Sequence, residues 1–159
     1  MEDVIDSGWL TKGPKTQAFE EIVRRYLKIK HAIAVSSGTA ALHLSLLSLD
    51  IGPGDEVIVP DFTFPATANA VELCGAKAVL VDIDPVSLNI DVESAIRKIS
   101  NKTRAIIPVH QFGNPAEMDR ILDIARRYNL HIVEDAACAL GARYKNRMCG
   151  TIGLSLIHI

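Results

Sequence analysis

Short apolar segments alternate with helix-like segments along most of this 159-residue chain, and this alternation restricts the fold more than any other feature. A helix between two strands implies a right-handed crossover, which makes the strands parallel neighbours in one sheet with helices on both faces. We therefore expect an α/β fold with three α/β/α layers and a mostly parallel sheet. The expected strands are 32–35, 56–59, 78–81, 105–109 and 131–133, and the expected helices are 16–29, 39–49, 63–74, 91–99 and 117–128.

Two of the expected helices carry additional signals. The helix at 39–49 is apolar on nearly all sides, which indicates that it is buried. The helix at 117–128 is preceded by Asn114-Pro115, a pair whose chemistry is typical of a helix start. An acceptor at Asn114 would therefore cap this helix.

The composition excludes several classes of function. The formal net charge is −2 and the basic residues are scattered, so the chain has no electrostatic footprint for nucleic acid. No apolar run reaches membrane-spanning length, and the acidic start Met1-Glu2-Asp3 does not resemble an export signal. The three cysteines show neither paired nor metal-ligand spacing, which fits a reducing cytoplasmic setting and gives no metal site.

The stretch Ser36-Ser-Gly-Thr39 joins the first expected strand to the buried helix. Unsatisfied backbone N–H groups at a helix N-terminus attract anions, and Gly38 lets the backbone approach a ligand closely. These residues could form a phosphate cup, but an ordinary Ser/Thr helix cap is the better explanation for an isolated tetrapeptide.

Two other strand-end loops carry candidate residues. Phe62 and Phe64 could stack on a planar ring, although packing beneath the loop is the plainer explanation. His110 could exchange a proton with a substrate, but a hydrogen-bonded structural histidine is more common. Cys138, a short step beyond Asp135, could face the same space as that carboxylate, although a small apolar filler is the default interpretation.

The segment Leu130 to Ala137 reads as a buried strand that ends in Asp135 and is followed by two alanines. Ligands of open parallel sheets bind beyond the carboxyl ends of the strands. Asp135 could therefore hold a ring nitrogen protonated, as pyridoxal phosphate requires, or it could merely cap the next segment. Because all four loops fall at one edge of the predicted sheet, together they favour a cofactor site.

With these motifs in place, the chain resembles the DegT/StrS family of sugar-nucleotide aminotransferases, within the aspartate aminotransferase (fold type I) superfamily. The resemblance implies that residues 31–153 form part of a large pyridoxal phosphate-binding domain, incomplete at its C-terminus. Residues 1–30 would form an N-terminal loop and helix, and residues 154–159 a tail that departs from the family pattern. The likeness rests on Trp9–Pro14, Ser37–Leu42, Gly52–Val57, Asp82–Pro85, Pro108–His110 and Glu134–Ala137.

By position, the resemblance implies that Gly38, Thr39 and the Ala40 amide hold the cofactor phosphate. It also implies that Phe64 stacks on the pyridine ring and that Asp135 pairs with the ring nitrogen. The last role is physically sound, because a charge-assisted hydrogen bond contributes roughly 1.5–3 kcal/mol to keeping that nitrogen protonated.

The sequence also departs from the family pattern. Cys138 stands where the family has Gln, His or Glu, and none of the eight lysines stands in the context of the Schiff-base lysine. We therefore expect a truncated chain that is itself inactive.

For the whole protein, the resemblance implies amino transfer to a nucleotide-linked keto-sugar in amino-sugar or polysaccharide biosynthesis, with glutamate as the expected donor. The Trp9–Pro14 segment favours the sugar C4 position. A homodimer is expected. A dehydratase of the same family and an inactive cofactor-binding fragment are the alternatives.

Overall fold

The computed structural model describes residues 2–9, 11–153 and 155–157, with side chains up to residue 153, and divides the chain into two units. The first unit, residues 1–35, contains helix α1 (Glu2–Asp6) and helix α2 (Pro14–Leu27). Pro14 starts α2, where the missing N–H of proline costs nothing, and Lys28 ends it in the left-handed conformation.

The strand predicted at 32–35 is wrong. This segment joins no sheet, and Ile33 is 75% exposed. Its backbone bonds elsewhere, since the N–H of Ala34 donates to the carboxylate of Glu20 on α2 over 2.9 Å. A short apolar run satisfies the pattern of a strand, but it becomes one only where a neighbouring strand pairs with it.

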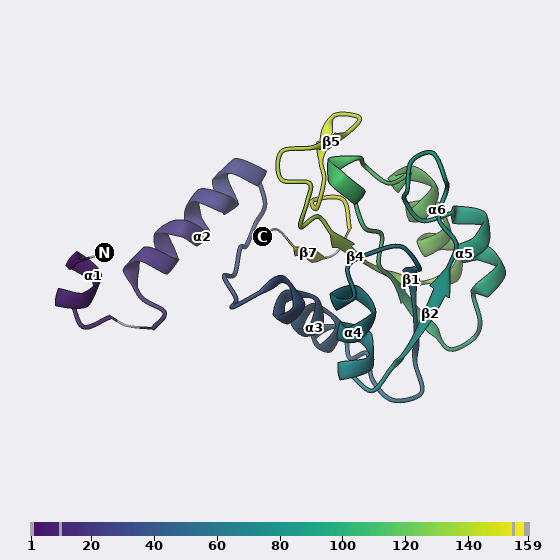
Figure 1. Ribbon diagram of the computed structural model, residues 1–159, viewed down its shortest axis with the longest axis horizontal. Helices are drawn as coiled ribbons and strands as arrows, with labels where there is room; N and C mark the ends of the chain where they lie inside the picture. The colour runs from purple at the N-terminus through teal and green to yellow at the C-terminus, as the bar shows by residue number, and fades with distance from the viewer. Residues whose placement is uncertain (1, 10, 154, 158–159) are drawn as a thin grey trace. The chain divides into compact units, whose positions relative to one another are not determined.

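The second unit, residues 36–159, is built on a five-stranded sheet in the order β2-β1-β3-β4-β7 (Figure 1). All of its neighbouring pairs are parallel, which confirms the predicted sheet type. The strands are β1 (Glu56–Pro60), β2 (Lys77–Val81), β3 (Thr103–Ile106), β4 (His131–Asp135) and β7 (Ser155–Ile157). A separate antiparallel hairpin joins β5 (Arg143–Tyr144) and β6 (Arg147–Met148).

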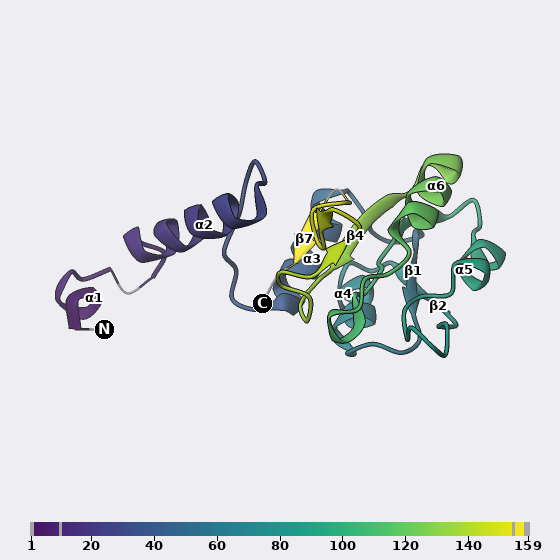
Figure 2. The same cartoon turned by 90° about the horizontal axis from the view of Figure 1, so that it is seen from above.

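Helices cover both faces of this sheet, as predicted (Figures 1 and 2). Helices α3 (Gly38–Ser48) and α4 (Ala66–Leu73) pack on one face through Leu42, Leu46 and Val71. Helices α5 (Val92–Lys98) and α6 (Met118–Tyr128) cover the other face, where Ile121 is fully buried. No helix of the described residues is long and apolar enough to cross a membrane.

Strand β4 places its two acidic residues on opposite faces of the sheet. Ile132 belongs to the core beneath α5 and α6, whereas Val133 belongs to the core beneath α3 and α4. Because side chains alternate along a strand, Glu134 follows Ile132 and Asp135 follows Val133. Asp135 therefore faces the α3/α4 layer.

Strand β3 ends at Ile106, earlier than the strand predicted at 105–109. Pro108 lacks an N–H and interrupts the ladder, leaving Val109 in an isolated bridge with Asp135. The prediction that Asn114 caps α6 is also wrong. Glu117 occupies the cap position without a side-chain bond, and Asn114 instead donates its amide to the carbonyl of Ser87 over 3.1 Å.

Candidate active site

Asp135 is the last residue of β4, and its backbone is fixed on both sides. Its N–H donates to the Pro108 carbonyl over 2.9 Å, and its carbonyl accepts from the His110 N–H over 3.0 Å. The side chain is only 6% exposed. One carboxylate oxygen accepts from the Ala137 N–H over 3.2 Å, so the cap-like contact considered from the sequence is present.

The other oxygen of Asp135 accepts a hydrogen bond from the hydroxyl of Thr67 on α4 over 3.1 Å. Thr67 is fully buried, and its oxygen also lies 3.1 Å from the hydroxyl oxygen of Thr63. Among the described residues, each carboxylate oxygen thus has one donor, whereas each can accept about two hydrogen bonds. The carboxylate retains acceptor capacity for a ligand.

Glu134, the neighbouring acid, is fully buried on the opposite face and accepts four hydrogen bonds. Its donors include the N–H groups of Gly150 at 2.6 Å and Ile152 at 2.5 Å, as well as that of Gly153. The fourth donor is His110, over 3.0 Å. This carboxylate anchors the 150–153 segment against β4.

His110 is a structural residue, the more common of the two roles considered from the sequence. It is fully buried, and its Nδ1 accepts from the Ala116 N–H over 3.1 Å. Because a protonated imidazole has no acceptor, the ring must be the neutral tautomer that carries its proton on Nε2 and donates it to Glu134. Both ring nitrogens are therefore used.

The N-terminus of α3 has both features considered from the sequence. Ser37 caps the helix by accepting from the Ala40 N–H over 3.1 Å. The backbone N–H groups of Gly38 and Thr39 donate no hydrogen bond within the described part of the chain. Two free donors at a positive helix end suit an anion.

Aromatic rings gather at the loops that follow β1 and β3. Phe62 and Phe112 lie with their ring centroids 6.5 Å apart, and the Gln111 amide donates to the Phe62 carbonyl over 2.6 Å. Phe64 is 77% exposed, so it does not pack beneath its loop in this unit. Cys138 is also exposed.

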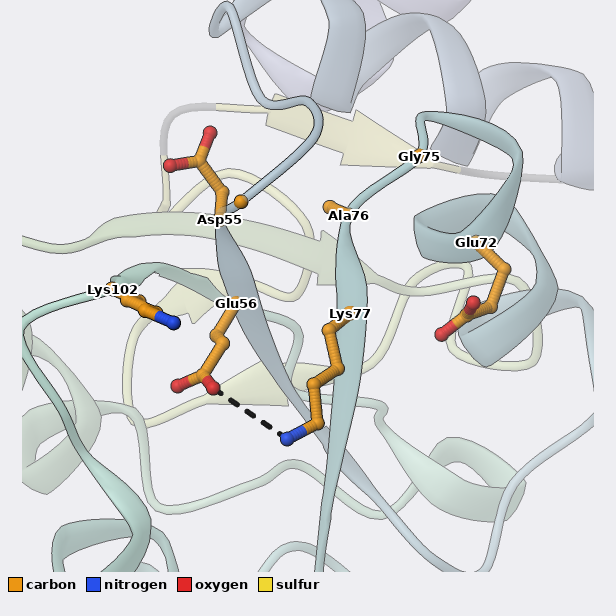
Figure 3. A pocket seen from close by; sticks show the side chains of 8 residues that line it. Asp55, Glu56, Glu72, Gly75, Ala76, Lys77 and Lys102 are labelled. Atoms are coloured by element: carbon orange, nitrogen blue, oxygen red, sulfur yellow. Dashed lines mark ion pairs between the residues drawn. The ribbon is translucent and has the colours of Figure 1, made fainter.

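A cavity of the second unit lies where strands β1 and β2 begin (Figure 3). It measures about 320 Å³ and is lined by the starts of β1 and β2, where Lys77 pairs with Glu56 over 3.6 Å. Lys77 is exposed in this pair, whereas Glu56 is half-buried. Within the described ranges, no cluster of His, Cys, Asp or Glu could hold a metal ion.

A second cavity, of about 290 Å³, lies within the first unit. Trp9, Thr11, Gly13 and Pro14 line it, so the N-terminal motif forms a concave surface. A side chain at residue 13 would crowd Trp9, since an added Cβ would lie 3.0 Å from the Trp9 Cβ.

Sequence reasoning missed Thr67, Glu134 and Gln111 as parts of this region. Thr67 lies in the expected helix and shows no distinct motif. The pair Glu134-Asp135 carried a usable signal, because two adjacent acids at a strand end must face opposite sides. Only the fold could show that Glu134 is saturated by backbone donors.

Comparison with known proteins supports the same fold and family. An uncharacterized protein of Methanocaldococcus jannaschii, MJ1066, is 53% identical over 95% of this chain and 39% of that protein. GDP-perosamine synthase of Caulobacter vibrioides is 47% identical over 95% of this chain and 41% of its own. The chain thus spans about two fifths of these relatives.

The crystal structure of S. venezuelae DesV, in complex with a ketimine intermediate, superposes with a TM-score of 0.91. It is 45% identical, covering 94% of this chain and 40% of DesV. The predicted fold type I architecture is confirmed by this likeness. The family prediction is confirmed too, because residues 1–157 match one aminotransferase family. The chain belongs to the DegT/DnrJ/EryC1/StrS aminotransferase family.

Proposed function

We propose that the whole protein transfers an amino group from glutamate to a nucleotide-linked keto-sugar, at C4 of the sugar, using pyridoxal phosphate. The observation that carries this proposal is Asp135, a nearly buried carboxylate at the carboxyl end of β4 with acceptor capacity to spare. GDP-perosamine synthase, named for an amino-sugar product, supports the substrate class. The Trp9–Pro14 segment supports the C4 position.

The described residues fit the cofactor. The free N–H groups of Gly38 and Thr39 would bind its phosphate, and Asp135 would accept a hydrogen bond from its ring nitrogen. The exposed Phe64 is available to stack on its ring. The Ala40 N–H already serves the Ser37 cap, so Ala40 would contribute only by exchanging that bond for the phosphate.

When bound, pyridoxal phosphate supplies an electron sink, whose strength depends on a protonated ring nitrogen. The chain contributes by holding a negative charge at that nitrogen. Asp135 does so from a site where little water can screen it, and its neighbours fix the direction of its carboxylate. Dimer formation and assembly of the lysine-bearing part of the site belong to the whole protein and are part of the proposal.

The test is an assay of the whole protein with glutamate, pyridoxal phosphate and a panel of nucleotide-linked 4-keto-sugars. We expect equal amounts of 2-oxoglutarate and aminated sugar nucleotide, and a rate at least about tenfold lower for Asp135→Asn. The 159-residue chain alone is expected to give no product. The reason is that none of its lysines stands in the context of the Schiff-base lysine. Two of them, Lys77 and Lys145, form ion pairs with Glu56 and Asp119.

Loss of a sugar hydroxyl without 2-oxoglutarate formation would instead establish the dehydratase alternative. An aminated product at another sugar carbon would overturn the C4 assignment alone.

A further inference from the structure

The hydroxyl of Thr67 is hydrogen-bonded to the carboxylate of Asp135, although the two residues come from different layers of the fold. Thr67 belongs to the first turn of α4, and Asp135 ends β4 in the sheet beneath it. We infer that Thr67 is a positioning residue that fixes the Asp135 carboxylate toward the cofactor ring nitrogen. The inference rests on the proposed function.

The direction of the hydrogen bonds follows from the number of protons. An ionised carboxylate only accepts, so the single hydroxyl proton of Thr67 is donated to Asp135 over 3.1 Å. The Thr67 oxygen must then accept from the hydroxyl of Thr63, 3.1 Å away. The result is an ordered chain of donors that runs from Thr63 through Thr67 to Asp135.

Two anchors hold the carboxylate of Asp135, and they come from separate elements. The Ala137 N–H holds one oxygen and Thr67 holds the other. Because the backbone of Asp135 is already fixed within the sheet, the side-chain torsions are the remaining freedom. Without Thr67, a single contact of 3.2 Å would restrain them.

The hydroxyl of Thr67 requires an explanation beyond packing. Thr67 is fully buried on the same helix as the core residues Ala70 and Val71, and valine would fill nearly the same volume. Burying a hydroxyl is unfavourable unless it is hydrogen-bonded. The bond to Asp135 offsets that cost.

The experiment measures binding of pyridoxamine 5′-phosphate to the whole protein. This form carries the phosphate and the pyridine ring and needs no lysine for attachment. We expect Thr67→Val to weaken binding about tenfold, the lower end for a hydrogen bond to a charged group, and Thr67→Ser to change it less than about twofold. With a ¹⁵N-labelled ring, the pH midpoint of ring-nitrogen deprotonation should fall by about one unit in Thr67→Val and remain unchanged in Thr67→Ser.

Coupling to Asp135 separates positioning from general packing. In the Asp135→Asn background, Thr67→Val should have no further effect on either measurement. Thr103→Val is the matched control, because Thr103 is another buried threonine whose hydroxyl is hydrogen-bonded, at the start of β3. We expect this control to bind the ligand as the unchanged protein does.

Equal losses for Thr67→Ser and Thr67→Val would overturn the inference, as would additive losses in the double variant. If Thr67→Val does not fold, the Thr67→Ser result and Thr67→Ala decide in the same way. Failure of the proposed function looks different, because pyridoxamine 5′-phosphate would then not bind or Asp135→Asn would bind it equally well.

Discussion

Glu134 and Asp135 are adjacent acids at the end of one strand, yet their surroundings differ completely. Glu134 is fully buried and accepts four hydrogen bonds from groups of its own chain. Asp135 is nearly buried and accepts two side-chain hydrogen bonds from the residues that the structure describes. The strand pleat alone separates them, because it turns one side chain toward α5 and α6 and the other toward α3 and α4.

The difference shows how one strand end can serve both stability and chemistry. A buried carboxylate with a full set of donors is an internal anchor, since no acceptor capacity is left for a ligand. A buried carboxylate with spare capacity at the ligand-binding edge of a parallel sheet is available to a ligand. Counting donors therefore separates the two roles where burial does not.

The largest effect should come from Glu134→Gln. The amide would turn its NH₂ group toward backbone N–H donors, which leaves buried donors unpaired. With two donors left unpaired at about 1–3 kcal/mol each, we expect the free energy of unfolding to fall by about 2–6 kcal/mol, as measured by urea denaturation.

Asp135→Asn is the matched change on the other face of the strand. It should lower the free energy of unfolding by less than about 1 kcal/mol, because the amide oxygen can still accept from Ala137 and Thr67 can turn to accept from the amide. Similar losses for the two variants would break the distinction between anchor and ligand partner.

A smaller effect concerns Cys149, which is buried beside the 150–153 segment. Burial, reinforced by the charge of Glu134, raises the pKa of the Cys149 thiol to about 11. An unfolded thiol loses its proton near its ordinary pKa of 9.0, whereas the folded one keeps it, so the unfolded state binds fewer protons between these values. Stability should therefore fall as the pH rises from about 9 to about 11.

Cys149→Ala serves as the comparison, because it removes this thiol and retains Cys74. We expect the stability of the unchanged protein, measured by urea denaturation, to decline more steeply than that of the variant over this pH range. If the stability of the two proteins declines equally with pH, burial and the charge of Glu134 do not raise the pKa of the Cys149 thiol.

Much of the fold followed from the sequence because periodicity reports burial. Three strands and the helices between them lie close to their predicted positions. These strands were predicted at 56–59, 78–81 and 131–133. Their parallel pairing followed from the crossovers. The segment at 32–35 failed because an apolar run does not specify a pairing partner.

The candidate site was predictable only in part. Asp135, Gly38 and Thr39 carried local signals, namely a strand-end acid and a helix start. Thr67 and Glu134 did not, since their importance depends on donors that are distant in sequence, such as Thr67 for Asp135 and Gly150 for Glu134. The cap predicted at Asn114 failed for the same reason, because its amide bonds to the distant carbonyl of Ser87.

The most direct test of the central claim is a crystal structure of the whole protein with pyridoxamine 5′-phosphate bound. We predict that the ring nitrogen lies within about 3.2 Å of an Asp135 carboxylate oxygen, a normal hydrogen-bond distance, and that the phosphate contacts the N–H groups of Gly38 and Thr39. A ligand bound elsewhere, or one whose ring nitrogen faces away from Asp135, would contradict the assignment.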